Sequence, residues 1–144
     1  MKTNLNKYTI ERLKKFDIRP SVQRIAIMNY LMNNCNHPTA ETIFINLSNN
    51  IPTLSKTTVY NTLKLLVKNG AIIEINIDDK NLRYDANIST HAHFKCCNCG
   101  YLCDVPVKNS TLLSTKKIGS LIILESQLHY KGYCEKCNIK LKKL

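Results

Sequence analysis

The sequence contains no long apolar run. Crossing a bilayer takes about 18–20 consecutive apolar residues, and no stretch of the chain approaches that length. The opening residues MKTNLNKYTIERLKK carry charge but lack the apolar segment of a secretion signal. Internal repeats and low-complexity tracts are also absent. These absences exclude a membrane-spanning protein, and we expect a cytoplasmic protein without a membrane partner.

Acidic side chains are scarce. The 144 residues include 21 Lys and Arg against 10 Asp and Glu, which gives a formal net charge of +11 at pH 7. Much of the excess lies in residues 1–70, where 10 positive and 3 negative side chains give a net charge of +7. This balance favours a polyanionic partner, with nucleic acid first and an anionic membrane surface second.

Two C-x-x-C pairs, Cys96 with Cys99 and Cys134 with Cys137, are the most informative motif. Two thiolates three positions apart in a tight turn point the same way, so each pair can bind one face of a Zn²⁺ ion. Two pairs complete a tetrahedral shell of four sulfurs. Disulfides or redox-active cysteines are the alternative. Zinc is favoured because nothing in the sequence predicts export to an oxidising compartment.

The first 70 residues have helical periodicity. Helices are expected near 5–16, from Pro20-Ser21, from Pro38-Thr39 and over 55–69. The last of these should bury a stripe that contains Val59, Leu63, Leu66 and Val67. After Gly70 the period changes from that of a helix to that of a strand. The segments AIIEINI and NLRYDAN flank Asp78-Asp79-Lys80 and predict a β-hairpin.

We therefore predict an α+β fold with two domains. Residues 1–86 should form a winged helix-turn-helix, in which helix 55–69 enters the DNA major groove and the hairpin is the wing. Residues 87–144 should form a small zinc-stapled α/β domain, joined through a hinge at 87–90. Its strands are expected in HAHFKC, YLCDVPV and LIILESQLHYKGYC, with a helix near 110–118. So small a unit needs such a metal for stability.

A second set of metal ligands is suggested by the histidines. His91 and His93 lie at alternate positions of a predicted strand and so face the same side. A zinc-bound turn folds the next strand back and brings Asp104 near them. Asp85 ends the wing, and His37 lies in the turn before a helix. Three imidazoles and two carboxylates suit Fe²⁺ or Mn²⁺ better than four thiolates do, although affinity order alone favours Zn²⁺ or Cu²⁺. The alternative is that these are ordinary turn, ion-pair and surface residues.

These residues together resemble the ferric uptake regulator (Fur) family of metal-dependent bacterial repressors. The matching stretches are R-P-S-V-Q-R at 19–24, H-P-T-A-E-T-I-F at 37–44, T-T-V-Y-N-T-L at 57–63, R-Y-D at 83–85, H-A-H-F-K-C-C-N-C-G at 91–100 and G-Y-C-E-K-C at 132–137. The resemblance covers nearly the whole chain. It implies a winged helix, a C-terminal dimerisation domain, and a homodimer that binds palindromic double-stranded operator DNA.

The resemblance also implies a role for the second ligand set. In the peroxide-sensing branch of the family, the regulatory Fe²⁺ or Mn²⁺ is held by residues that match His37, Asp85, His91, His93 and Asp104. Iron-sensing members tend to carry Glu where this chain has Asp104, so Asp104 favours the peroxide sensor. Iron-catalysed oxidation by peroxide would then fall on His37 and His91.

Other functions remain open at this stage. An iron-, zinc- or manganese-responsive repressor of the same family is the nearest alternative. A non-heme iron enzyme is more remote, because two histidines and a carboxylate can form a facial triad. A zinc-ribbon RNA-binding module would leave the winged-helix pattern unexplained. We expect a non-enzymatic regulator.

DNA contacts are expected from the recognition helix and from the arginines before the second helix. The candidates are Arg19, Arg24, Ser55, Lys56, Thr57, Tyr60, Asn61 and Lys64. The helix N-terminus and the basic side chains suit phosphates, while Tyr60 suits a thymine methyl group. Each of them could instead be a solvated surface residue. Three further cysteines, Cys35, Cys97 and Cys103, are expected to be buried neutral thiols, with a redox role as the alternative.

Overall fold

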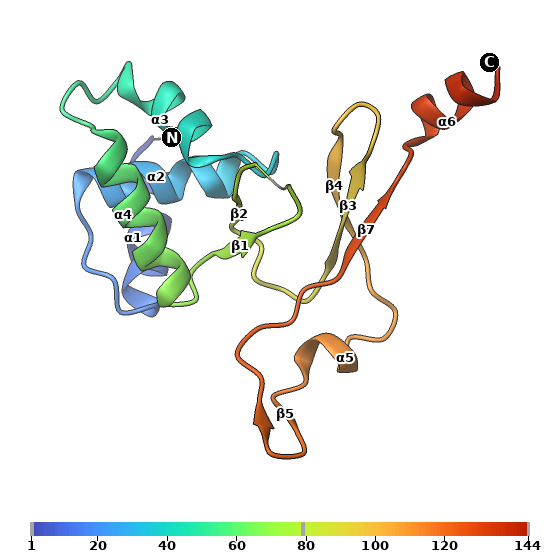
Figure 1. The fold of residues 1–144 in the computed structure, drawn as a ribbon. Coiled ribbons are helices and arrows are strands. Elements are labelled where there is room, and N and C mark those ends of the chain that lie inside the picture. The colour runs from blue at the N-terminus through green and yellow to red at the C-terminus, as the bar shows by residue number, and fades with distance from the viewer. Residues whose placement is uncertain (1, 79, 144) are drawn as a thin grey trace. The chain divides into compact units, whose positions relative to one another are not determined.

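The computed structural model describes residues 2–78 and 80–143, and the chain divides into two units, up to Ile88 and from Ser89 onward (Figure 1). The first unit contains four helices and a hairpin. They are α1 (Lys2–Lys15), α2 (Val22–Asn33), α3 (Ala40–Ser48), α4 (Lys56–Lys68), β1 (Ile73–Ile75) and β2 (Arg83–Asp85). This order of elements is that of a winged helix-turn-helix, as the sequence predicts.

Three of the four helices begin at a hydroxyl side chain. Ser21, Thr39 and Ser55 each have extended backbone angles and accept a hydrogen bond from the backbone N–H three residues later. Each cap satisfies one of the N–H groups that a helix start leaves without a partner. Helix α4 ends at Lys68, and Gly70 follows with φ +77°. That left-handed conformation, which glycine adopts at little cost, turns the chain into the wing.

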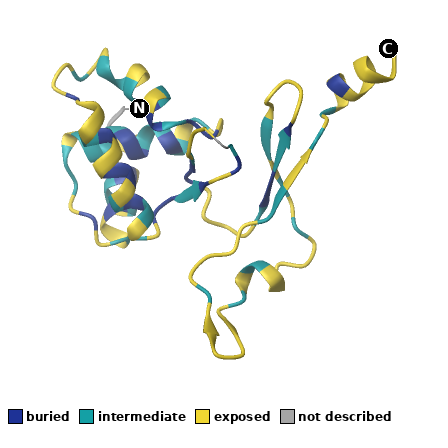
Figure 2. Cartoon of the chain, in the orientation of Figure 1, coloured by how far each residue is buried: buried dark blue, intermediate teal, exposed yellow. Residues whose placement is uncertain are grey.

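The core of the first unit lies between the apolar faces of these helices. Figure 2 shows buried residues along α2 and α4, with exposed residues on their other sides. Val59, Leu63 and Leu66 are fully buried, whereas Val67 is only partly buried at the edge of the same cluster. Thr62 is buried beside them, although periodicity in apolar residues does not mark it.

The wing is an antiparallel pair. Ile73 lies opposite Asp85 and Ile75 opposite Arg83 in the β1–β2 ladder. Asp79, in the turn of the predicted hairpin, lies outside the described residues. Arg12 connects the wing to α1, because its Nη2 donates hydrogen bonds to the carbonyls of Ala71 and Ala86. The ladder is short, but its open end, where Ile73 pairs with Asp85, is therefore fixed to α1.

The second unit contains a three-stranded sheet, a small hairpin and two helices. They are β3 (Ala92–Cys96), β4 (Leu102–Val105), α5 (Thr111–Ser114), β5 (Lys117–Ile118), β6 (Leu121–Ile122), β7 (His129–Gly132) and α6 (Glu135–Lys142). The sheet order is β4-β3-β7, with β4 antiparallel and β7 parallel to β3. Thus β3 is the central strand, β4 carries the predicted ligand Asp104, and β7 ends two residues before the predicted ligand Cys134.

Two expectations for this unit need correction. The helix near 110–118 extends only over Thr111–Ser114, because Lys117 pairs with Ile122 in the β5–β6 hairpin. The segment LIILESQLHYKGYC is not one strand but contributes β6 and, after a break, β7. Among the helices of the described residues, none combines the length and the apolar character that a membrane span requires.

Candidate metal centres and DNA-binding surface

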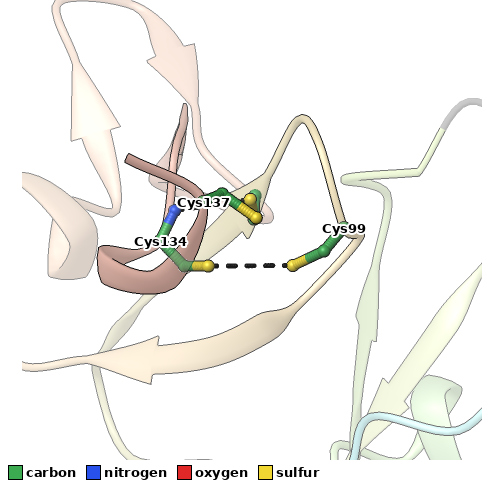
Figure 3. Close-up of side chains that lie close together, drawn as sticks. Cys99, Cys134 and Cys137 are labelled. Atoms are coloured by element: carbon green, nitrogen blue, oxygen red, sulfur yellow. Dashed lines mark hydrogen bonds between the residues drawn. The ribbon is translucent and has the colours of Figure 1, made fainter. Parts of the chain in front are cut away.

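The four cysteines of the two C-x-x-C pairs meet in the second unit. One sulfur from each of Cys96, Cys99, Cys134 and Cys137 lies within 4.8 Å of the others. Figure 3 shows Cys99 facing Cys134 across the cluster, with the two sulfurs 3.8 Å apart. All seven cysteines of the chain are free thiols. The disulfide alternative is therefore not realised, and the donor set is that of a closed tetrahedral zinc site.

The β-sheet brings the two turns together. We call residues 96–99 the N-terminal knuckle and residues 134–137 the C-terminal knuckle. Cys96 is the last residue of β3 and pairs with Gly132 at the end of β7. The backbone N–H of Cys97 donates to the Gly132 carbonyl over 2.7 Å. Gly100, with φ +76°, lets the chain leave the N-terminal knuckle toward β4.

The thiols of the cluster interact electrostatically. Backbone N–H groups, first that of Cys99 and then that of Cys134, lower the pKa of Cys96 to about 6. A backbone hydrogen bond at Tyr101 lowers the pKa of Cys99, but its side-chain interactions with the other cysteines, Cys96 first, raise it on balance to about 11. One thiol thus ionises readily and makes the next ionisation harder. A bound dication would remove this conflict, because it favours the charged form of every thiolate. The residues therefore fit zinc.

The second unit also brings together two histidines and an aspartate. His93 lies opposite Asp104 in the β3–β4 ladder. The Nε2 atoms of His91 and His93 are 3.0 Å apart, and each is 3.3 Å from Asp104 Oδ1. The Nδ1 of His91 is 2.6 Å from the Ser89 carbonyl. When a carbonyl accepts a hydrogen bond from one ring nitrogen, the other nitrogen has a free electron pair for a metal ion. This is the usual arrangement of metal-binding histidines.

The first unit brings together the other two predicted ligands. His37 Nε2 lies 3.5 Å from Asp85 Oδ2, and both residues are buried. His37 has φ +50°, in the left-handed region that a non-glycine residue seldom occupies. Such a conformation persists only where its surroundings enforce it, and it is frequent at functional sites. Here it turns the imidazole toward the carboxylate.

Strand β2 holds this pair in place. The Arg83 guanidinium donates to the His37 carbonyl over 3.2 Å, and the Tyr84 N–H donates to the Pro38 carbonyl over 3.1 Å. Asp85 is thereby fixed beside the turn that carries His37. Its other oxygen accepts the backbone N–H of Asn87. Arg83 itself pairs with Asp78, at 3.3 Å, and not with Asp85.

The exposed face of α4 carries most of the predicted DNA contacts. Its solvent-exposed candidates are Ser55, Lys56, Thr57, Tyr60, Asn61 and Lys64. Helix α4 has no acidic residue in its first turn, so its positive dipole end is open to an anion. The Lys56 ammonium lies 3.8 Å from an exposed carboxylate of Glu41. Such surface pairs are weak and exchange readily for a phosphate.

A hollow between α4 and the start of α2 holds the remaining candidates. Arg19, Arg24 and Asn61 line it together with Gln23 and Thr58. Arg24 Nη1 donates a hydrogen bond to the Arg19 carbonyl over 2.8 Å, so these two arginines lie side by side. Sequence reasoning missed Gln23 and Thr58. Only the pairing of α2 against α4 shows that these polar residues flank the predicted contacts.

The three additional cysteines differ from expectation. Cys35 and Cys97 are exposed, and Cys103 is partly buried. The prediction of buried thiols is therefore wrong for the first two. Cys35 follows the end of α2, and Cys97 lies inside the N-terminal knuckle, directly after the end of β3. Neither position belongs to an apolar stripe, which is the only signal that would have predicted burial.

The fold and the two ligand sets define a winged-helix protein with a Cys₄ metal centre and a histidine–aspartate site. The chain belongs to the ferric uptake regulator family, whose model matches residues 15–120. The chain is 32% identical over 136 residues to the peroxide operon regulator of Bacillus subtilis, covering 93% of this chain and 94% of that protein.

Solved structures agree with this assignment. The peroxide-sensing regulator PerR from Streptococcus pyogenes is 28% identical, with a TM-score of 0.52 and 92% of each chain covered. The ferric uptake regulator of Helicobacter pylori has a TM-score of 0.70 at 19% identity, covering 92% of this chain and 93% of that one. The second likeness concerns the fold alone.

Proposed function

We propose that this protein is a metal-dependent DNA-binding repressor that senses peroxide through oxidation of its own metal-ligand histidines. The observation that carries the proposal is the convergence of His91 and His93 on Asp104, in a unit with a separate Cys₄ centre. The shorter Asp104, where iron sensors tend to have Glu, favours the peroxide branch. The relatives named as peroxide regulators support the same choice.

The regulatory ion in this proposal is Fe²⁺ or Mn²⁺, and the structural ion is Zn²⁺. His91, His93 and Asp104 of the second unit would supply three ligands, and His37 and Asp85 of the first would supply two. Nitrogen and carboxylate oxygen donors suit these metals, whereas the four sulfurs suit zinc. An ion bound by ligands from both units would favour one arrangement of the two over all others.

That restriction is the proposed link to DNA. Residues 1–86 would act as the DNA-binding domain and residues 87–144 as the dimerisation domain of a cytoplasmic homodimer. Two recognition helices reach successive major grooves of a palindromic operator only when their separation matches the DNA repeat. Metal would then bind the DNA-competent form better than other forms, and by linkage operator DNA would strengthen metal binding.

Peroxide would end repression by changing the ligands. A bound Fe²⁺ would supply one electron to H₂O₂ and take one back from the ring that is oxidised, chemistry that Mn²⁺ does not readily perform. One oxygen atom of the peroxide replaces a hydrogen on a ring carbon of His37 or His91, and the other leaves as water. The oxidised ring is a poorer donor, so the ligand set loses the metal. The protein consumes its own side chains, and we propose no catalytic turnover of a substrate.

An operator is first selected from random DNA duplexes by binding to the protein in the presence of Mn²⁺, and we expect it to be palindromic. Binding to this operator is then measured by fluorescence anisotropy under anaerobic conditions. The zinc-loaded protein is titrated with Fe²⁺ or Mn²⁺ and then given about one equivalent of H₂O₂. We expect both metals to support binding and peroxide to release DNA only from the Fe²⁺ form. Mass spectrometry should find one added oxygen on His37 or His91. DNA release with unmodified histidines would contradict the mechanism, and retention of DNA by both forms would indicate a plain metal sensor.

A further inference from the structure

The two knuckles of the Cys₄ centre exchange hydrogen bonds with each other's sulfurs. The backbone N–H of Cys134, in the C-terminal knuckle, donates to Cys96 Sγ over 3.3 Å. The side-chain amide of Asn98, in the N-terminal knuckle, donates to Cys137 Sγ over 3.2 Å. The two sulfurs that accept these bonds belong to the buried cysteines of the cluster, whereas Cys99 is exposed and Cys134 is partly exposed.

Only one of these donors depends on the identity of a side chain. Any non-proline residue at 134 offers a backbone N–H, but a donor to Cys137 Sγ requires an amide, or a similar group, at position 98. Asn98 therefore reaches with its side chain from one knuckle to a buried sulfur of the other.

We propose that Asn98 is a positioning residue of the structural zinc site, which holds Cys137 in its binding orientation and stabilises its thiolate. An N–H donated to a charged acceptor is stronger than a neutral hydrogen bond. It removes electron density from the sulfur and fixes the Cys137 side chain against the opposite knuckle. The C-terminal knuckle follows the end of β7, and a bond from Asn98 ties it to the opposite knuckle, so that bond opposes its departure with the metal.

The inference rests on zinc binding by the four cysteines, as proposed above. Partners that orient metal ligands typically contribute 10–100-fold to metal affinity. We therefore expect Asn98→Ala to lose zinc to a chromophoric chelator about 10–100-fold faster than the natural chain, under reducing and anaerobic conditions. Asn98→Asp should lose zinc at least as fast as Asn98→Ala. Asp has the same shape and suits the same turns, but it offers no N–H and places a negative charge beside a thiolate.

Lys136→Ala is the matched control. Lys136 is exposed in the C-terminal knuckle, and its removal changes the net charge by the same amount as Asn98→Asp. We expect Lys136→Ala to hold zinc nearly as the natural chain does. If Asn98→Asp also held zinc normally while only Asn98→Ala lost it, Asn98 would act as a turn former, and the proposal would be wrong.

A spectroscopic readout separates the hydrogen bond from general stability. Replacing zinc by Co²⁺ gives sulfur-to-metal charge-transfer bands whose energy reports the electron density on the thiolates. Relative to the natural chain, loss of the Asn98 donor should shift these bands to lower energy in both Asn98 variants. Lys136→Ala should show no such shift. Unshifted bands with unchanged zinc loss would overturn the inference. Absence of any sulfur-to-cobalt band in the natural chain would instead overturn the Cys₄ assignment.

Discussion

His93 and Asp104 face each other across the β3–β4 ladder, with Nε2 of the histidine 3.3 Å from Oδ1 of the aspartate. The antiparallel register of β3 and β4, which places the two residues opposite each other, sets this distance. One additional methylene in the acid would move its oxygen relative to both His91 and His93. Residue 104 is therefore where the response of the site can be changed without changing its ligand types.

The first prediction concerns the length of this acid. Asp104→Glu should retain metal-dependent operator binding, because a carboxylate is still available. The rate at which H₂O₂ releases the Fe²⁺ form from DNA should fall by about tenfold or more, since reaction geometry at a metal is sensitive to displacements on the order of 1 Å. Stopped-flow anisotropy measures that rate. An unchanged rate would show that residue 104 does not distinguish a peroxide sensor from an iron sensor.

The second prediction concerns the ligands of the first unit. Asp85→Ala removes one of them and leaves His37 without the carboxylate 3.5 Å away. Metal-dependent DNA binding should fall by at least about 100-fold, more than is typical for losing a supporting partner. Zinc content and dimerisation should be unchanged, because the Cys₄ cluster lies in the second unit and dimerisation is proposed to occur there. Elemental analysis and sedimentation serve as controls, and normal metal-dependent binding would refute the shared ligand set.

The third prediction concerns Tyr60, which is 49% exposed on α4. Tyr60→Ala should weaken specific operator binding by about 1–3 kcal/mol, the range of a good base contact, and non-specific binding much less. Tyr60→Phe keeps the ring that would contact a thymine methyl group, so it should bind nearly normally. Competition anisotropy with operator and random duplexes measures the ratio. Equal losses on both duplexes would make Tyr60 a contact to the DNA backbone.

The fourth prediction concerns pH. Zinc binding requires thiolates, and the pKa of Cys99 is raised to about 11 in the metal-free cluster. Below that pKa, protons compete with zinc for Cys99. The apparent zinc affinity should therefore decrease about tenfold for each unit by which the pH is lowered, for each thiol that is protonated in the metal-free chain. Cys96, with a pKa of about 6, should add to the slope only in acid. Chelator competition between pH 6 and 8 tests this, and a flat profile would contradict thiolate binding.

The sequence predicts most of the first unit because its signals are local. Ser21, Thr39 and Ser55 indicate where three helices begin. The spacing of Val59, Leu63 and Leu66 predicts the buried face of the last one. The wing and the two C-x-x-C turns follow from the change of period and from cysteine spacing. All of these signals lie within a few residues of the feature that they predict.

The remaining features depend on contacts between distant segments. Nothing near His37 indicates its left-handed conformation, which is set by the turn and by hydrogen bonds from β2. The β5–β6 hairpin replaces the predicted end of α5 because Gly119, at φ +58°, allows a tight turn inside an apolar stretch. The hydrogen bond from Asn98 to Cys137 crosses 39 positions of sequence, and spacing within one motif cannot reveal it.

Strand β3 carries His93 near one end and Cys96 at the other. Loss of zinc would free Cys96 and Cys134, and with them the knuckle that follows β7 and anchors it beside β3. The Cys96–Cys99 turn, which joins β3 to β4, would be released as well and would no longer help to hold His93 opposite Asp104. Under the proposed function, a chain without zinc would respond neither to the regulatory metal nor to the oxidant. Under the same proposal, zinc starvation would relieve repression as peroxide does.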